Sequence, residues 1–152
     1  MTTYIKLTDQ DRVNLKIAYL NFLQNIINRM STFGIAMKTA SVTTLTALLA
    51  YSASDSVGNN FKLWMFFIPW VFFAGYHAYF LRLERTFRNL YNNYANQEYI
   101  SFSDFKIDKN RLDPIYEKWT DVICSKPLVI FHLTLILIVI ISFAKIKGIP
   151  CF

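Results

Sequence analysis

The chain has 152 residues, of which 54% are hydrophobic and 17% aromatic, and its formal net charge is +6. A soluble domain is about 45–50% apolar, and here the apolar excess is gathered in three blocks, which favours membrane spans over a large soluble core. The positive charge suits the basic cytoplasmic segments of a membrane protein. Phosphate-binding glycine loops, zinc spacings and aromatic–basic RNA motifs are absent from the sequence, so nucleic acid is not an expected partner.

The first predicted element is one long helix over residues 9–53, which begins in water and ends in lipid. Thr8 and Asp11 have the spacing of a capping box, which would start the helix. Apolar residues then recur in steps of three and four, so that they share one helix face: Val13, Ile17, Leu20, Leu23, Ile27 and Met30. This stripe either lies on the bilayer surface or packs on other helices in an assembly. We favour packing, because a surface-binding helix carries a more basic polar face.

Residues 33–53 predict the first membrane span, because about 20 apolar residues cross a hydrocarbon core of about 30 Å. Two stripes of small or hydroxyl-bearing residues run along it at helical spacing: Ala36, Ala40, Thr44 and Ala47 in one, and Thr39, Thr43 and Thr46 in the other. Such stripes let helices approach closely in lipid. Two interpretations stay open, tight helix packing and a hydroxyl stripe that lines a water-filled path in an oligomer.

Residues 63–81 predict a second span, which is rich in aromatic residues and contains Pro69, a residue that bends a helix. The helical pattern continues beyond the span over residues 82–94, where arginine and asparagine alternate with apolar residues. The second helix is therefore expected to leave the membrane and extend into water, as the first one does.

Residues 95–118 lose the helical period and predict a compact cytoplasmic loop whose apolar residues dock on the helices. A short helix over residues 114–124 would lead into the last span, residues 127–144, whose even lipophilicity suggests exposure to lipid. His77 and His132 both lie near the cytoplasmic ends of their spans. A histidine at such a place is expected to hydrogen-bond a neighbouring helix, and a proton relay is the alternative.

The distribution of lysine and arginine gives the orientation, because basic residues collect in cytoplasmic segments. Segments 1–32 and 82–126 are basic, the latter with eight lysines and arginines, whereas the first connection has only Lys62. The N-terminus is therefore expected in the cytoplasm and the C-terminal tail outside, although Lys145 and Lys147 run against the rule. The sequence predicts a single all-α domain over 1–152, an integral membrane protein with three transmembrane helices, the first two extended into the cytoplasm.

Two cysteines, Cys124 and Cys151, are too few for a disulfide scaffold. The orientation places them on opposite sides of the membrane, where they cannot pair. The sequence contains no pattern that joins a nucleophile to a base and no metal-binding cluster, so an enzyme, a metal and a cofactor are not expected.

Five basic residues near the cytoplasmic boundary form a candidate ligand-binding site: Arg29, Lys38, Arg82, Arg85 and Arg88. Arg82, Arg85 and Arg88 follow one another in steps of three, and Arg29 lies at the corresponding depth of the first helix. Antiparallel packing of the two helices would bring them together, and guanidinium groups grip phosphate with two hydrogen bonds. Lys38 either faces this site or extends its amine to the headgroups. The alternative is that the charges serve membrane topology alone.

Three sets of residues run through most of the chain: Gln24-x-x-Ile27-Asn28-Arg29-Met30 with Lys38, then Tyr79-Phe80-Leu81-Arg82-x-Glu84-Arg85-x-Phe87-Arg88-x-Leu90-Tyr91, then Trp119-x-x-Val122-x-x-Ser125. They resemble a family of small bacterial multi-pass membrane proteins that are often encoded beside TIR-domain proteins in phage-defence loci. The family usually has Asn-Ser where this chain has Phe33-Gly34. A ligand contact made by that polar pair would be missing here.

The resemblance implies a membrane effector of bacterial anti-phage defence. A TIR-domain partner would make a nucleotide signal on infection, and this protein would respond by oligomerising and compromising the inner membrane. The expected partners are membrane lipids, further copies of the chain, and the TIR-domain protein or its product. The alternative is a passive anchor or assembly subunit for a soluble partner. An uncontrolled transporter or channel is disfavoured, because three short spans contain no inverted repeat.

Overall fold

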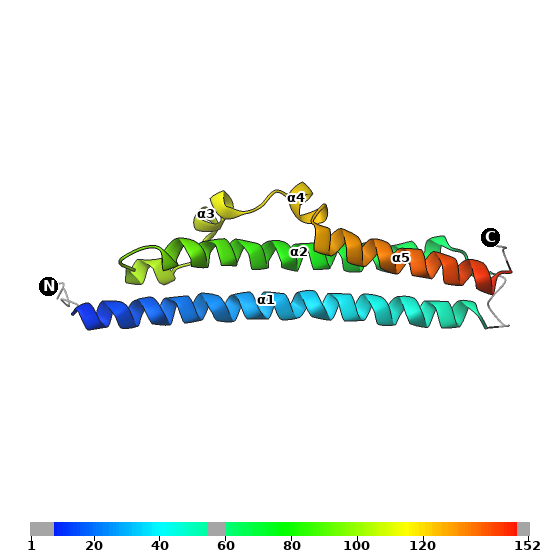
Figure 1. The fold of residues 1–152 in the computed structure, drawn as a ribbon, viewed down its shortest axis with the longest axis horizontal. Helices are drawn as coiled ribbons and strands as arrows, with labels where there is room; N and C mark the ends of the chain where they lie inside the picture. Colours follow the sequence, from blue (N-terminus) through cyan, green and yellow to red (C-terminus); the bar gives the residue numbers. More distant parts are fainter. Residues whose placement is uncertain (1–7, 55–59, 149–152) are drawn as a thin grey trace.

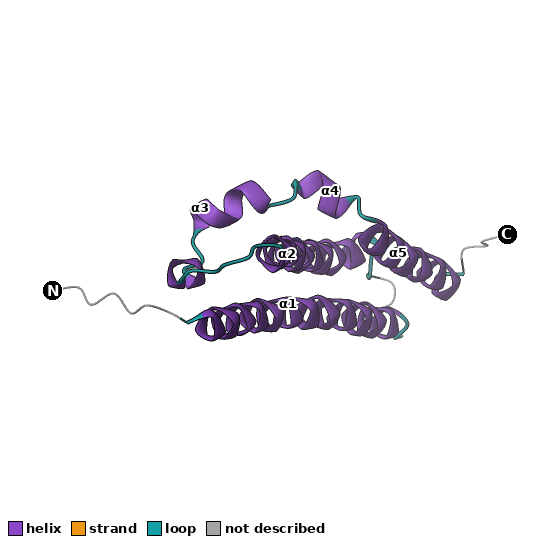
Figure 2. Ribbon diagram, turned by 60° about the vertical axis from the view of Figure 1, so that its left-hand side comes forward, coloured by secondary structure: helices purple, strands orange, loops and turns teal. Residues whose placement is uncertain are grey.

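The computed structural model describes residues 8–54 and 60–148, and within these ranges the chain is helical with no strand. Helix α1 (Asp9–Ser52) and helix α2 (Trp64–Ala95) lie side by side and antiparallel along an elongated rod, and helix α5 (Lys126–Ile146) packs beside one end of the pair (Figures 1 and 2). All three are long and apolar enough to cross a membrane. The chain is therefore an all-α, multi-pass membrane protein, as the sequence predicted.

Helix α1 begins at the predicted capping box. The Thr8 hydroxyl accepts a hydrogen bond from the Asp11 amide at 3.2 Å, and the Asp11 carboxylate accepts one from the Thr8 amide at 3.0 Å. Hydrogen bonds from the Thr8 hydroxyl and amide stabilise the charged carboxylate, and they lower the pKa of Asp11 below its usual value. The helix then continues for 44 residues without a break, across the boundary between its polar and apolar parts.

Helix α2 contains Pro69 and continues 14 residues past its predicted membrane span, to Ala95. The segment from residue 96 to 125 then returns along α2 (Figure 1). It contains four short helical pieces: η1 (Phe102–Phe105), α3 (Lys109–Leu112), η2 (Asp113–Ile115) and α4 (Trp119–Ile123). The short helix predicted over 114–124 is thus divided between η2 and α4. Cys124 follows α4 and is exposed, whereas Cys151 lies outside the described residues.

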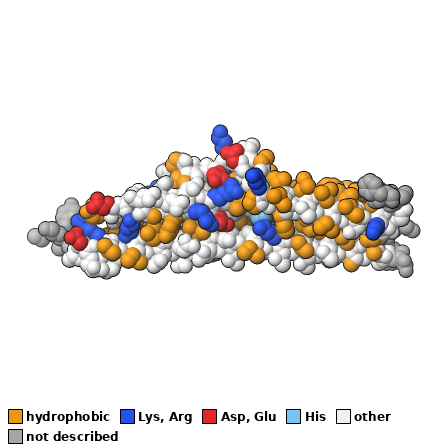
Figure 3. Space-filling view, viewed as in Figure 1, with side chains coloured by type: hydrophobic (Ala, Val, Ile, Leu, Met, Phe, Trp, Pro, Cys, Tyr) orange, Lys and Arg blue, Asp and Glu red, His pale blue; other side chains and the backbone are white. Residues whose placement is uncertain are grey.

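Two parts of the rod differ in their side chains, and Figure 3 shows charged groups gathered toward one end and hydrophobic ones toward the other. We call residues 8–32 and 82–125 the polar half, and the remaining described residues the apolar half. The polar half has a core around Tyr19, which is fully buried. The Tyr19 ring makes edge contacts with Tyr94 and Phe105, each at a centroid distance of 4.9 Å.

The buried stripe of α1 in this half runs through Tyr19, Leu23 and Ile27. Val13 and Ile17 belong to the stripe that the sequence predicted, but their side chains are 51% and 53% exposed. The predicted apolar face is therefore only partly covered within one chain, because the packing of α2 and the loop follows Tyr19 instead.

The loop docks on the helices as predicted through apolar residues that include Ile100, Phe105 and Ile107, whereas Phe102 is 66% exposed. Ile100 is buried in the Tyr19 cluster, and Phe105 packs against it. Arg111 Nη1 donates hydrogen bonds to the Asp104 carboxylate at 3.2 Å and to the Tyr94 hydroxyl at 3.2 Å. These contacts fix the loop on the end of α2.

In the apolar half the core joins all three long helices. Its buried members are Leu45, Phe61, Phe66, Val139 and Phe143. Phe61 and Phe143 each meet the Phe66 ring with centroids 5.1 and 5.5 Å apart. A smaller cluster of Ala78, Val122 and Leu128 then connects α2 to α4 and the start of α5.

Candidate functional site

The small and hydroxyl-bearing residues of α1 lie mostly on its outward side. Of the residues predicted to pack in an oligomer, Ala36, Thr43, Thr46 and Ala47 are exposed, whereas Ala40 and Thr44 are half-buried. The contacts of α1 with its own chain use the opposite side, where Ser41, Leu45 and Ser52 are buried. We call the exposed set the hydroxyl face; its members are Ala36, Thr39, Thr43, Thr46, Ala47 and Ala50.

The outward faces of the other two spans have a different composition. On α5 the exposed residues include Ile130, Leu133, Leu137, Ile138 and Ile141, and on α2 they include Ile68, Val71 and Phe72. Large apolar side chains are what hydrocarbon favours, whereas small residues are typical of contacts between helices in lipid. The hydroxyl face is thus unlike a lipid-facing surface. Its residues stay exposed within the chain, although Thr39 and Thr43 share a surface hollow with Phe131 of α5.

Two of the predicted ligand-binding arginines hold the returning segment on α2. Arg85 Nη1 lies 2.9 Å from a carboxylate oxygen of Glu117, and Arg82 Nε donates a hydrogen bond to the Glu117 carbonyl at 2.8 Å. The Arg82 guanidinium also lies over the rings of Tyr116 and Trp119, at 4.6 and 4.7 Å from their centroids. These arginines therefore have a structural role at the boundary between the two halves.

The other basic residues have separate surroundings. Arg88 forms an ion pair of 2.7 Å with Glu84, one helical turn away. The Arg29 guanidinium lies 5.9 Å from the ring centre of Phe33 on its own helix. The structure thus brings Arg82 and Arg85 together at Glu117 and places Arg29 and Arg88 in other contacts.

A buried histidine pair links α2 to α5 inside the apolar half. His77 Nδ1 and His132 Nε2 are 3.0 Å apart, and both side chains are buried. Each histidine therefore bonds a neighbouring helix, as predicted. Trp70 Nε1 donates a further hydrogen bond to the His132 carbonyl at 3.0 Å.

One polar atom of this pair remains without a partner among the described residues. It is the second ring nitrogen of His132, Nδ1. A neutral imidazole has one donor and one acceptor, so a shared proton between the rings still leaves one group of each histidine available. Buried polar groups of this kind are usually satisfied by water.

A small cavity connects the histidine pair to the polar half. It measures about 90 Å³, and its lining includes Gly34, Lys38, His77 and Glu84. Lys38 also lies over the Phe131 ring, with Nζ 5.7 Å from its centre. Lys38 is therefore turned toward the helices of its own chain at the depth of the histidines, whereas no contact among the described residues places it beside Arg29. A shared ligand site with Arg29 stays a prediction.

These side chains could hold water and protons in the part of the span that adjoins the polar half. Glu84 stands at the polar end of the cavity, and His77 leads to His132. The cavity beside His77 is lined in part by polar side chains and has room for water at this end of the span. The proton relay stays a prediction.

The sequence indicates that both histidines lie near the ends of their spans, but it does not predict the contact between them. His77 stands four residues before the predicted end of its span and His132 five residues after the predicted start of its own. Equal depth in two helices was the available signal for a contact. The rotation of each helix, which decides whether the rings meet, was not visible in the sequence.

Comparison of the chain with family models, with curated proteins and with solved structures gave no match. The resemblance to defence-associated membrane proteins therefore stands on the residue strings in α1, α2 and α4 alone. Within the described residues, no group of three or more histidine, cysteine, aspartate or glutamate side chains is placed to hold a metal ion.

Proposed function

We propose that this protein is a membrane effector of bacterial anti-phage defence. It resides in the inner membrane with its N-terminus in the cytoplasm, forms a homo-oligomer of four or more copies, and compromises the membrane when a nucleotide signal or a TIR-domain partner acts on it. The hydroxyl face of α1 carries this proposal. The residue strings shared with the defence-associated family supply its biological setting.

The hydroxyl face extends from Ala36 to Ala50, which is about 21 Å of helix at 1.5 Å per residue and most of a hydrocarbon core of about 30 Å. A passive anchor needs only lipid-compatible side chains, and α5 shows that this chain has a span of that kind. A ring of α1 helices that turn this face toward one another would bury the alanines in close contacts and gather the threonine hydroxyls near the centre. Such a ring can seal when packed and admit water when its helices shift.

The orientation supports a signal that arrives from the cytoplasm, because the polar half contains most of the lysines and arginines. Thiol labelling of intact cells with an impermeant maleimide tests it. We expect Cys151 to react and Cys124, which is exposed but on the cytoplasmic side, to be protected. Reaction of Cys124 alone would reverse the orientation.

Co-expression with the TIR-domain partner separates an effector from an anchor. We expect loss of membrane potential and of viability only when both proteins are present. The triple change Thr39→Val, Thr43→Val and Thr46→Val keeps the shape of the hydroxyl face while it removes the hydroxyls, and it should abolish this toxicity without preventing assembly.

The matched control changes three lipid-facing residues of α5, Ile130→Val, Ile138→Val and Ile141→Val, and should leave toxicity intact. A wild-type pair that never depolarises the membrane would instead support the anchor. Equal toxicity of the threonine variant and the control would remove the hydroxyl face from the mechanism.

The basic residues are tested by Arg29→Lys, which preserves charge and removes the guanidinium fork. Arg29 forms no ion pair with a described residue, so the variant should insert and assemble normally. We expect it to lose partner-dependent toxicity if Arg29 binds the signal. Arg85→Lys is compared with Glu117→Gln, because the ion pair between these residues has its own structural role. Full toxicity of both lysine variants would mean that the basic cluster serves topology only.

A further inference from the structure

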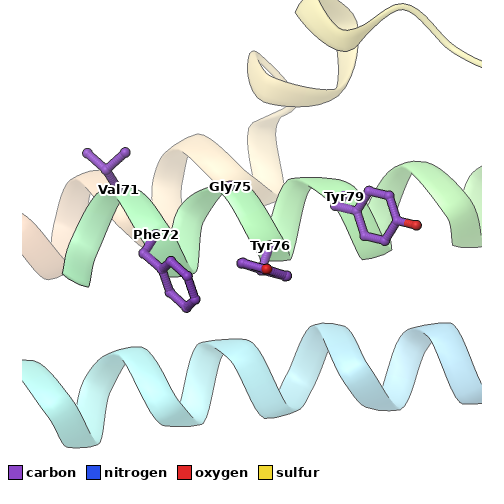
Figure 4. A pocket seen from close by; sticks show the side chains of 5 residues that line it. All are labelled: Val71, Phe72, Gly75, Tyr76 and Tyr79. Carbon is purple, nitrogen blue, oxygen red and sulfur yellow. The ribbon is translucent and has the colours of Figure 1, made fainter. Parts of the chain in front are cut away.

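The outward surface of α2 contains a groove in the apolar half. Its volume is about 580 Å³, and its lining residues all belong to one helix: Val71, Phe72, Gly75, Tyr76 and Tyr79. Figure 4 shows the side chains of Val71 and Phe72 pointing to opposite sides of the helix, with Gly75 between the large residues. Apart from the neighbouring residues and the backbone of its own helix, no heavy atom lies within 4 Å of the place where a Cβ on Gly75 would be. We call this feature the α2 groove.

The lining of the α2 groove is apolar and open to the outside of the molecule. Its four side chains are between 44% and 59% exposed, and none is used in a buried core cluster of the chain. In a membrane the volume beside Gly75 is filled by hydrocarbon or by another protein. The large aromatic lining, in contrast to the small residues of the hydroxyl face, is suited to a flexible acyl chain rather than to close helix contact.

A ladder of side chains connects the polar end of the groove to a guanidinium group. The Tyr79 ring stacks on Trp119, with centroids 6.5 Å apart and an angle of 21° between the planes. Arg82 lies 4.7 Å from the centre of the Trp119 ring and 4.6 Å from that of Tyr116. The groove therefore ends at an aromatic and cationic cluster, which is the combination found at the level of lipid headgroups.

Arg82 has hydrogen-bonding capacity left at this place. Its Nε donates to the Glu117 carbonyl, whereas its two Nη groups donate to no described residue. The Glu117 carboxylate is engaged by Arg85. Lys118 adds a second positive charge next to Trp119, and Asp121 is the acidic residue that opposes them on α4. The balance is positive, and a guanidinium with free Nη groups can bind a phosphate oxygen.

We propose that the α2 groove and Arg82 together form a binding site for one anionic phospholipid per chain. One acyl chain lies along the groove beside Gly75, and the phosphate accepts hydrogen bonds from the Arg82 Nη groups beside Trp119. This site is independent of the effector proposal, because it lies on α2 and needs neither the hydroxyl face nor a signal.

Native mass spectrometry of the detergent-purified full chain tests the site, with phosphatidylglycerol and phosphatidylcholine as the two probes. We expect one phosphatidylglycerol to be retained per chain, with at least tenfold preference over phosphatidylcholine. Gly75→Leu fills the groove and should reduce retention of both lipids at least tenfold. Arg82→Gln should remove the preference for phosphatidylglycerol and leave the weaker binding of phosphatidylcholine.

Two matched variants control for bulk and charge. Thr134→Leu enlarges an exposed residue on α5, and Arg12→Gln removes an arginine that also lies over an aromatic ring, Tyr99, but far from the groove. Both should retain phosphatidylglycerol as the wild type does. Equal loss in Arg12→Gln and Arg82→Gln would show a general charge effect and overturn the site.

Gly75→Leu decides the question alone if Arg82→Gln fails to insert, because Gly75 contacts no part of the returning segment. Unchanged retention of phosphatidylglycerol in that variant would overturn the proposal. Equal binding of the two lipids by the wild type would do so as well.

Discussion

The two halves of the rod differ in where their polar groups lie. In the polar half the interior is built from aromatic and aliphatic side chains around Tyr19, and ion pairs such as Arg88–Glu84 lie at the surface. In the apolar half the interior contains the buried polar residues Ser41, His77 and His132, whereas α5 presents isoleucine and leucine outward. The surface of the same two helices is therefore suited to water along one part of their length and to lipid along the other.

Part of the outward surface of the apolar half departs from this composition, namely the hydroxyl face of α1. It lies on the outside of the apolar half but has the composition of an interior. If large apolar side chains mark the surfaces of the apolar half that face lipid, another protein surface covers the hydroxyl face. We therefore test the hydroxyl face first, and then the interiors of the two halves.

The largest effect is expected on the hydroxyl face. Thr43→Leu combined with Ala47→Leu adds bulk where helices would approach closely, and should shift the oligomer at least tenfold toward monomer in nanodiscs, as counted by stepwise photobleaching. Ile130→Phe adds similar bulk to the lipid-facing side of α5 and should leave the copy number unchanged. A wild-type protein that is monomeric in every lipid would break the comparison, since the hydroxyl face would then be turned to lipid.

The buried histidine pair should respond as a unit. His77→Leu or His132→Leu alone leaves the other ring without its partner, at a cost of about 1–3 kcal/mol in unfolding free energy. The double variant should cost less than the sum, with a coupling of about 0.6–1.7 kcal/mol, the range measured for hydrogen bonds between membrane helices. Reversible unfolding of all four proteins in mixed micelles gives the cycle. Strict additivity would mean that the hydrogen bond does not form.

The interior of the polar half is tested by alkaline titration. Burial, followed by the neighbouring Tyr94, raises the pKa of Tyr19 above the usual value of about 10. Because the folded pKa is the higher one, Tyr19 contributes stability that is complete below pH 10 and decreases as the pH rises above it. Absorbance at 295 nm should show a late phenol ionisation, coincident with loosening of the loop. Burial also raises the pKa of Tyr94, so Tyr19→Phe should reduce the amplitude of this late phase by one tyrosine. Ionisation of all tyrosines near pH 10 would contradict a buried Tyr19.

The smallest effect is expected at Gly34, which lies on α1 beside His77. A Cβ at this position would lie 3.8 Å from His77 Cδ2, which is an ordinary contact. Gly34→Ser should therefore insert normally and stabilise α1 by about 0.5 kcal/mol through helix propensity. A loss of stability greater than 1 kcal/mol would show that the surroundings of His77 are tighter than the structure indicates.

The sequence was sufficient for those parts of the fold that depend on local pattern. Capping by Thr8, the position of Pro69 inside a helix and the three spans were all readable, because each follows from residue spacing or hydrophobic length. The docking of the loop on the long helices was also predicted, because apolar residues in a polar loop, such as Phe105, are expected to be buried against neighbouring helices.

The candidate sites were less accessible, because they depend on how helices turn relative to one another. The apolar stripe predicted on the first helix does not include Tyr19, although the docked loop makes Tyr19 the centre of the polar half's core. The partner of Arg85, Glu117, lies 32 residues away in a segment without periodicity. No spacing rule connects such residues, and only the path of the returning segment brings them together.

The unbroken course of α1 has a mechanical consequence. A single helix of 44 residues, about 66 Å long, joins the polar end of the molecule to the far side of the membrane, and it contains no proline. Because Tyr19 and Leu45 are buried against the rest of the chain, a torque applied near Asp11 would turn α1 together with α2 and α5. Successive residues stand about 100° apart, so a rotation of the whole chain by less than that would replace the hydroxyl face with the neighbouring strip of Ile35 and Val42. Such a rotation in the polar half would change which side chains of the apolar half face a neighbouring copy.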